Sequence, residues 1–207
     1  NDLEYSIYDV LTGRKPILEV LELSESGGYQ VLPANGDLTA AEVELLSMND
    51  KEYLLRNSLN TLRNLFDYIL IDCPPSLNML TLNAMVACNG VIIPMQCEYY
   101  ALEGLSALVD TINQVQQLNS ELKIEGILRT MYDPRNSLTI DVSAQLSDFF
   151  GDSLYRTCVP RNVRLAEAPS YGQPALIYDR QSKGAIAYLA MAGEMIRRNE
   201  AAEACTA

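Results

Sequence analysis

A short apolar run that ends in an acid and two prolines is the feature that most constrains the fold of this chain. Residues 68–71 read Tyr-Ile-Leu-Ile, and Asp72, Cys73, Pro74 and Pro75 follow them. Such a run predicts a strand buried on both faces, and the prolines end it because they cannot donate to a β-ladder. We therefore expect Asp72 at the carboxyl end of a parallel strand, the edge at which open α/β sheets bind ligands.

The expected position of Asp72 suits a magnesium ion. Mg²⁺ keeps several of its waters in proteins and usually takes only one or two carboxylates. The Asp72 carboxylate would therefore hold the ion through a water molecule. An acidic strand end followed by an ordinary turn explains the same residues, because a pattern this short is weak by itself.

Apolar positions along the chain alternate between helical spacing and buried-strand runs. Strands alternating with helices imply right-handed crossovers and a parallel sheet covered on both faces. We predict a doubly wound α/β fold, with one domain over residues 1–198 and a disordered tail over residues 199–207. The predicted helices are 3–11, 40–65 with a break near Asn49, 77–88, 101–118, 139–150 and 184–198, and the predicted strands are 29–32, 68–71, 90–95, 124–131 and 154–159.

The composition excludes several kinds of site. The 207 residues include no histidine, so Ser-His and Cys-His nucleophilic arrangements are excluded. The five cysteines form no Cys-x-x-Cys pair, which indicates reduced thiols rather than a zinc site. No apolar run reaches the roughly eighteen residues of a membrane span, and no secretion signal is recognisable. We therefore expect a cytoplasmic protein that does not bind membranes.

The charge of the chain is unevenly distributed. A net charge of −12 disfavours nucleic-acid binding, because neutralisation of phosphates by Lys and Arg supplies most non-specific affinity. Seven of the fifteen basic residues nevertheless fall from Arg156 onward. A basic patch on one face of an acidic protein is therefore compatible with the composition.

Several segments carry a family resemblance. Residues 68–76, Tyr-Ile-Leu-Ile-Asp-Cys-Pro-Pro-Ser, resemble the Walker B segment of the ParA (Soj) family of chromosome and plasmid partition ATPases. Residues 93–105, 130–135, 159–172 and 178–184 resemble further segments of that family in the expected order. The resemblance covers essentially the whole chain and implies a P-loop NTPase fold of the deviant Walker A type.

The phosphate-binding loop of such a fold is missing from the sequence. The chain contains no Gly-x-x-x-x-Gly-Lys-Ser/Thr, whose backbone N–H groups and lysine would meet the phosphates. In the ParA family that loop lies before the point at which this sequence begins. We therefore expect a fragment without the Walker A segment, inactive as given although the intact protein is an ATPase. A natural domain without the loop is the alternative.

The resemblance implies ATP and Mg²⁺ as cofactors and assigns roles to individual residues. Asp72 corresponds to the catalytic Walker B aspartate that orients water around Mg²⁺. Pro74, Pro75 and Ser76 correspond to the switch loop that senses the γ-phosphate, and a rigid turn is the other interpretation.

The adenine site is implied by segments further along the chain. Pro160 and Asn162 correspond to adenine contacts, and Thr130 and Met131 would line the same pocket. Without the resemblance, Asn162 is a helix cap and Met131 a core residue. Residues 98–104 are expected near the nucleotide and the dimer face, although capping and packing explain them as well.

The basic residues of the last quarter are candidates for DNA contacts. A dimer of this family would bind DNA phosphates without reading sequence. Solvated surface charge is the alternative for each residue singly. The candidates are Arg161, Arg164, Lys183, Arg197 and Arg198.

The function implied is that of a partition ATPase at the nucleoid. ATP with Mg²⁺ would close a homodimer, the dimer would bind DNA non-specifically, and a ParB-like partner would stimulate hydrolysis. A division-site ATPase resembling MinD would need a membrane-binding amphipathic helix, and residues 199–207 offer no bulky apolar side chain for it. An iron–sulfur reductase would need cluster cysteines. A non-catalytic scaffold that has lost the loop is a further alternative.

Overall fold

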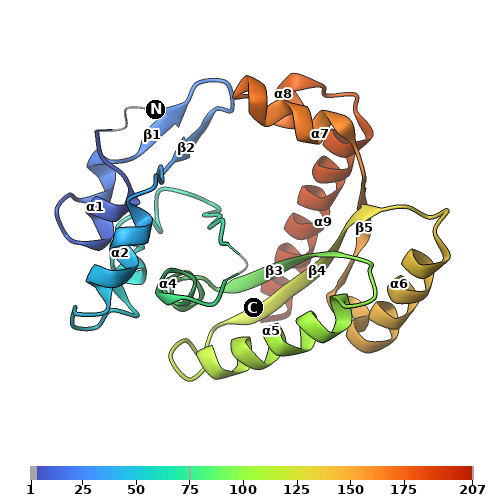
Figure 1. Ribbon diagram of the computed structural model, residues 1–207, viewed down its shortest axis with the longest axis horizontal. Coiled ribbons are helices and arrows are strands. Elements are labelled where there is room, and N and C mark those ends of the chain that lie inside the picture. Colours follow the sequence, from blue (N-terminus) through green and yellow to red (C-terminus); the bar gives the residue numbers. More distant parts are fainter. Residues whose placement is uncertain (1–3, 75, 207) are drawn as a thin grey trace. The chain divides into compact units, whose positions relative to one another are not determined.

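The computed structural model describes residues 4–74 and 76–206, which group into two compact units. The first unit comprises residues 1–91 and 111–123, and the second comprises residues 92–110 and 124–207. Figure 1 shows the helices and strands of both units. The single domain expected over residues 1–198 stays a prediction.

The first unit is built of short helices and one hairpin. Strands β1 and β2 pair antiparallel, with Leu23 opposite Gln30, and Gly28 turns the hairpin at a φ of 70°, a value that favours glycine. Asp50, also at positive φ, lies between α2 and α3, where the sequence predicts a break. The elements are α1 (Ile7–Leu11), the 3-10 turn η1 (Ile17–Glu19), β1 (Glu22–Ser24), β2 (Tyr29–Val31), α2 (Leu38–Leu45), α3 (Leu54–Leu59) and α4 (Met79–Ala87).

Local capping and one buried amide organise this unit. Ser6 and Asp9 form a capping box at the start of α1, and Asn78 caps α4 by accepting from the backbone N–H of Thr81 at 3.0 Å. Asn83 on α4 is 1% exposed. Its side chain accepts from the Leu55 N–H at 3.1 Å and donates to the Lys51 carbonyl at 2.7 Å. Helices α3 and α4 are therefore joined through hydrogen bonds as well as apolar packing.

The second unit contains a three-stranded sheet in the order β3-β4-β5. Strands β4 and β5 are parallel, with Ile127 opposite Leu154 and Tyr132 opposite Pro160. In Figure 1, α9 lies on one side of this sheet and α6 on the other, so the sheet is covered on both faces as predicted for an α/β fold. The elements that lie wholly or mainly in this unit are β3 (Gly90–Gln96), α5 (Ala101–Val115), β4 (Lys123–Tyr132), α6 (Ser137–Phe150), the turn η2 (Gly151–Ser153), β5 (Leu154–Pro160), α7 (Val163–Glu167), the turn η3 (Ala168–Tyr171), α8 (Ala175–Tyr178) and α9 (Lys183–Thr206). Residues 111–115 of α5 and the first residues of β3 and β4 are grouped with the first unit.

The prediction of a strand over residues 68–71 is wrong. No strand is assigned there, and Tyr68 and Leu70 are 46% and 79% exposed rather than buried. A buried parallel strand is stabilised by hydrogen bonds to neighbouring strands, and no strand in the described residues pairs with this segment. An apolar sequence is therefore not sufficient for residues 68–71 to form a strand.

The closing helix extends into the predicted tail, residues 199–207, and the disorder expected there stays a prediction. Helix α9 continues to Thr206, because Ala201, Ala202 and Ala204 are strong helix formers. In the part of the chain that the structure describes, no helix is long and apolar enough to cross a membrane.

Candidate functional site

The segment around Asp72 lies in the first unit. Asp72 and Pro74 are exposed and have no regular secondary structure, and Pro75 lies outside the described residues. The Ser76 carbonyl accepts a hydrogen bond of 2.7 Å from the Thr81 hydroxyl, which ties the end of this segment to the first turn of α4. The predicted switch-loop residues therefore lead directly into a capped helix.

The donor chemistry at Asp72 fits an indirectly held Mg²⁺. Its carboxylate is exposed to solvent and offers the hard oxygen ligands that Mg²⁺ prefers. Within residues 4–74 and 76–206, no three Cys, Asp or Glu side chains gather into a metal-binding cluster. Burial, and next the charge of Asp72, raise the pKa of the neighbouring Cys73 thiol, so this thiol stays protonated at neutral pH and is a poor metal ligand.

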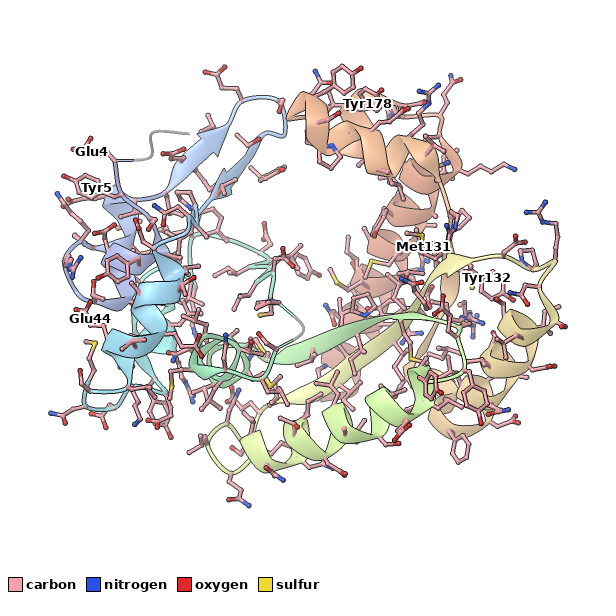
Figure 2. The ribbon with its side chains drawn as sticks, in the orientation of Figure 1. Glu4, Tyr5, Glu44, Met131, Tyr132 and Tyr178 are labelled. Carbon is pink, nitrogen blue, oxygen red and sulfur yellow. The ribbon has the colours of Figure 1, made fainter. Side chains whose placement is uncertain are left out.

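The predicted adenine contacts lie in the second unit, at the carboxyl ends of β4 and β5. Tyr132 stands opposite Pro160 in the parallel ladder, and the register shifts between Arg129 and Tyr132. Met131 lies at this irregularity with a φ of 51° and is 48% exposed, and Figure 2 labels it near the carboxyl end of β4. Met131 is therefore not the core residue that was its alternative interpretation.

Asn162 caps the helix that follows β5. Its side-chain oxygen accepts from the Arg164 N–H at 2.9 Å, so the capping interpretation is confirmed. A carboxamide oxygen has two lone pairs and the NH₂ group has two donors. Capping therefore does not use up the hydrogen bonds that an adenine edge would need, and the adenine contact stays a prediction.

An ion pair stands beside these strand ends. Asp133 accepts from Arg135 Nε at 2.9 Å and from Nη2 at 2.7 Å. These hydrogen bonds lower the pKa of the Asp133 carboxyl to about 2, and the charge of Arg161 contributes in the same direction. Asp133 consequently keeps a negative charge near Arg161, one of the predicted DNA contacts.

The five predicted DNA contacts fall into two groups. Arg164 pairs with Glu167 at 2.8 Å and with Asp179 at 3.4 Å. Arg198 pairs with Glu194 at 2.9 Å and donates to the carbonyls of Asp152 and Leu154. Arg161, Lys183 and Arg197 are exposed and form no ion pair among the residues that the structure describes. Arg198 therefore has a structural role, and Arg161, Lys183 and Arg197 are the better candidates for phosphate contacts.

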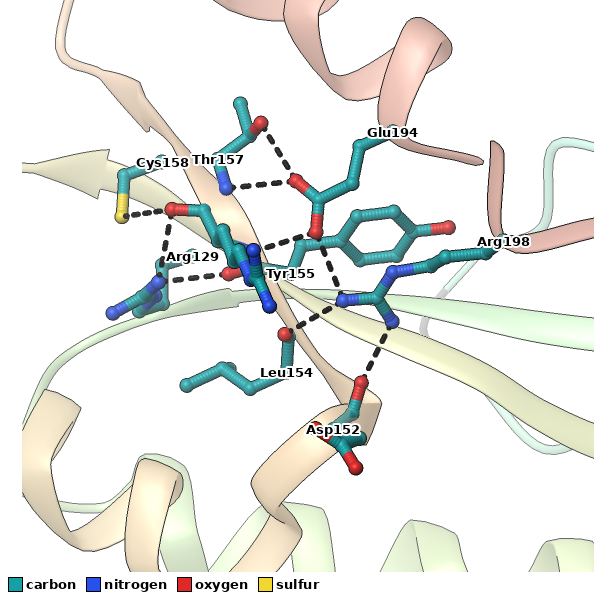
Figure 3. Close-up of polar contacts among 9 residues, drawn as sticks. Arg129, Asp152, Leu154, Tyr155, Thr157, Cys158, Glu194 and Arg198 are labelled. Carbon is teal, nitrogen blue, oxygen red and sulfur yellow. Dashed lines mark hydrogen bonds and ion pairs between the residues drawn. The ribbon is translucent and has the colours of Figure 1, made fainter. Parts of the chain in front are cut away.

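Glu194 is an important residue that the sequence analysis missed. It is 8% exposed on α9 and accepts from the N–H groups of Arg156 and Thr157 at 2.8 and 2.9 Å and from the Thr157 hydroxyl at 2.8 Å. Figure 3 shows these bonds together with those of Arg198, whose guanidinium stacks 4.3 Å above the Tyr155 ring. The sequence signal that could have revealed Glu194 is an acidic residue at a position of α9 where the helical spacing predicts an apolar one.

Comparisons with known proteins identify the family. A family model described as an AAA domain matches residues 1–124. An uncharacterized protein of Pseudomonas putida is 66% identical, the match covering 96% of this chain and 76% of that protein. The chromosome partitioning protein ParA of Myxococcus xanthus is 49% identical over 94% of this chain and 69% of its own length. The sporulation initiation inhibitor protein Soj of Bacillus subtilis is 45% identical, with coverages of 94% and 77%. The chain belongs to the ParA/Soj family.

Solved structures agree with the ParA/Soj fold. A Mycobacterium smegmatis structure described as cobyrinic acid a,c-diamide synthase with a bound ATP analog and magnesium has a TM-score of 0.81 and 36% identity, covering 96% of this chain and 74% of that one. The cell division ATPase MinD of Pyrococcus furiosus has a TM-score of 0.76 at 22% identity, with coverages of 95% and 77%. The MinD likeness shows the fold alone.

Proposed function

We propose that this chain belongs to a ParA/Soj-type partition ATPase that binds ATP with Mg²⁺, dimerises, binds DNA non-specifically and is stimulated by a ParB-like partner. The observation that carries the proposal is the 49% identity to a chromosome partitioning protein over 94% of the chain. DNA binding of this kind would place the protein at the nucleoid.

The residues present are compatible with a bound nucleotide and metal. Asp72 supplies the carboxylate for a water-bridged Mg²⁺, which when bound neutralises charge on the transferred phosphoryl group. Met131, Thr130, Pro160 and Asn162 stand at the carboxyl end of a parallel sheet, the edge at which such folds bind nucleotides. Support for these cofactors also comes from the Mycobacterium smegmatis structure, which holds an ATP analog and magnesium.

The named relatives favour partition over two other functions. The amide-synthase description belongs to a structure at 36% identity, below the 45 to 49% of the ParA and Soj proteins. A MinD-like role has only a likeness of fold in its support. A scaffold without catalysis remains the rival that an activity measurement removes.

The proposal is tested by ATP-dependent DNA binding of the full-length reading frame that contains this chain. Electrophoretic mobility shift on plasmid DNA of unrelated sequence, with ATP and Mg²⁺, with ADP, and with EDTA, separates the outcomes. Binding only with ATP and Mg²⁺, accompanied by slow hydrolysis, supports the partition ATPase. A full-length protein that neither binds nor cleaves ATP would be a scaffold, and the site assignments would be wrong with it.

The two groups of basic residues predict different salt dependences of that DNA binding. Arg161→Ala should weaken binding equally on all sequences and reduce the slope of log K against log salt by about 0.9, the value for one phosphate contact. Arg164→Ala should change the slope less, because Glu167 and Asp179 already neutralise that guanidinium. Filter binding at several salt concentrations measures both slopes. If Arg161→Ala left the slope unchanged and Arg164→Ala reduced it by about 0.9, Arg164 rather than Arg161 would be the phosphate contact.

A further inference from the structure

The first unit contains a groove that the nucleotide and DNA assignments do not use. It has a volume of about 430 Å³, and all of its lining residues belong to the first unit. One wall is formed by Glu42 of α2 and by Leu46, the C-cap residue of that helix, one helical turn further on. Met79, Leu82 and Met85 of α4 form the base. The third wall comes from residues 111–118 at the end of α5.

The groove is apolar and held open by a fixed framework. Among its lining residues, Met85 and Val115 are 7% and 6% exposed, whereas Leu46 and Leu77 are 55% and 60% exposed. Asn119 is 3% exposed and donates to the carbonyls of Met85 and Cys88 at 3.0 and 2.7 Å. The segment that follows α5 is therefore hydrogen-bonded to α4 and its C-terminal end. Leu46 and Leu77, which are partly exposed, would bury more apolar surface if a partner bound.

The shape and side chains favour a helical occupant over a small polar ligand. Within each wall the lining residues are spaced three or four positions apart, as on one face of a helix. The three sets are residues 42 and 46; residues 78, 82 and 85; and residues 111, 115 and 118. An amphipathic helix inserts side chains at i, i+4 and i+7 into such grooves. Methionine side chains such as Met79 and Met85 adapt their shape to a partner and are frequent on helix-binding surfaces.

The charge around the groove specifies the chemistry of the occupant. Glu42 is the only charged side chain among the lining residues that the structure describes, and its carboxylate accepts only a weak hydrogen bond of 3.4 Å from the neutral amide of Asn78. The unit that carries the groove has fourteen acidic and six basic residues in the sequence. A partner that brings a Lys or Arg beside its apolar face would pair with Glu42 and be attracted by the whole unit.

We propose that this groove binds a short amphipathic helix of a partner protein, with leucine-type side chains over Met79 and Met85 and one Lys or Arg against Glu42. None of the residues that line the groove is a predicted nucleotide or DNA contact. This binding therefore stands or falls independently of the partition activity.

The test uses a synthetic fourteen-residue helical peptide, labelled with fluorescein, with three leucines on one face and one arginine beside them. Fluorescence anisotropy against the chain is expected to show saturable binding. Leu46→Asp should weaken it at least about tenfold, equivalent to about 1.4 kcal/mol. Val43→Asp is the matched control, because Val43 is 72% exposed on the same helix and does not line the groove. Both positions are exposed, so neither change should unfold the chain.

A double-mutant cycle isolates the charge pair. Glu42→Gln and replacement of the peptide arginine by glutamine should each weaken binding, and the two changes together should lose less than the sum of the two single losses. Glu25→Gln on the exposed hairpin loop controls for general attraction to an acidic protein. Three results would overturn the proposal: no saturable binding, equal losses in Leu46→Asp and Val43→Asp, or a homodimer of the chain that Leu46→Asp dissociates. The last would place a second copy in the groove.

Discussion

Asp72→Ala is expected to reduce ATP turnover by the full-length reading frame about a hundredfold or more, while ATP binding persists. The physical reason is positional. In phosphoryl transfer the metal neutralises charge on the transferred group, and a carboxylate that orders water around the metal fixes it for that task. Removing the carboxylate should therefore lower the rate at saturating ATP and raise the Mg²⁺ concentration needed for half-maximal rate.

The environment of Asp72 makes this a clean experiment. Asp72 is exposed, and exposed substitutions typically change stability by less than about 0.5 kcal/mol, so lost activity would not reflect unfolding. Asp67→Ala is the matched control, since Asp67 is an exposed acid of the same segment. Phosphate release measured across a magnesium titration decides the matter. Equal rates in Asp72→Ala and the unchanged protein would remove Asp72 from the metal site, even if the partition ATPase itself were real.

The contrast between residues 68–71 and residues 124–131 explains what the sequence could predict. Residues 68–71 are uniformly apolar and residues 124–131 include Glu125 and Arg129, yet only the second segment forms a strand, as β4 paired with β5. A strand of a parallel sheet depends on hydrogen bonds to neighbours that lie far away in the sequence. Composition indicates a tendency to be buried but does not show whether a strand is available to pair with. The predicted strand over residues 68–71 is therefore absent, and with it the placement of Asp72 at a strand end, while the metal-binding role of Asp72 stays a prediction.

Helices were more predictable because their hydrogen bonds are local. The break near Asn49 coincides with the positive φ of Asp50, and Asn162 caps α7 as one interpretation proposed. What the sequence could not show is the pairing between elements. The ion pair between Arg164 and Asp179 joins residues that are far apart along the chain, and so do the hydrogen bonds from β5 to Glu194. Neither follows from any short motif.

Glu194→Gln is expected to destabilise the second unit by about 3 kcal/mol at neutral pH. Burial alone would raise the pKa of this carboxyl, but hydrogen bonds from Arg156, Thr157 and Arg198 outweigh it and lower the pKa from 4.5 to about 2. Each unit of pKa shift corresponds to about 1.4 kcal/mol between the two protonation states. Glutamine keeps the shape but replaces one acceptor oxygen by a donor that faces other donors, which leaves buried groups unpaired.

The pH dependence separates this electrostatic role from simple packing. Because the folded-state pKa is lowered, the stabilisation by Glu194 is complete above about pH 4.5 and is lost as the pH falls toward 2. The difference in unfolding free energy between the unchanged chain and Glu194→Gln should therefore shrink across that window, measured by urea unfolding followed by circular dichroism. Glu200→Gln, on the exposed side of the same helix, should change stability little at any pH. A destabilisation by Glu194→Gln that stays constant from pH 7 to pH 3 would mean that α9 is held to β5 by shape, and that the ionised carboxylate contributes nothing.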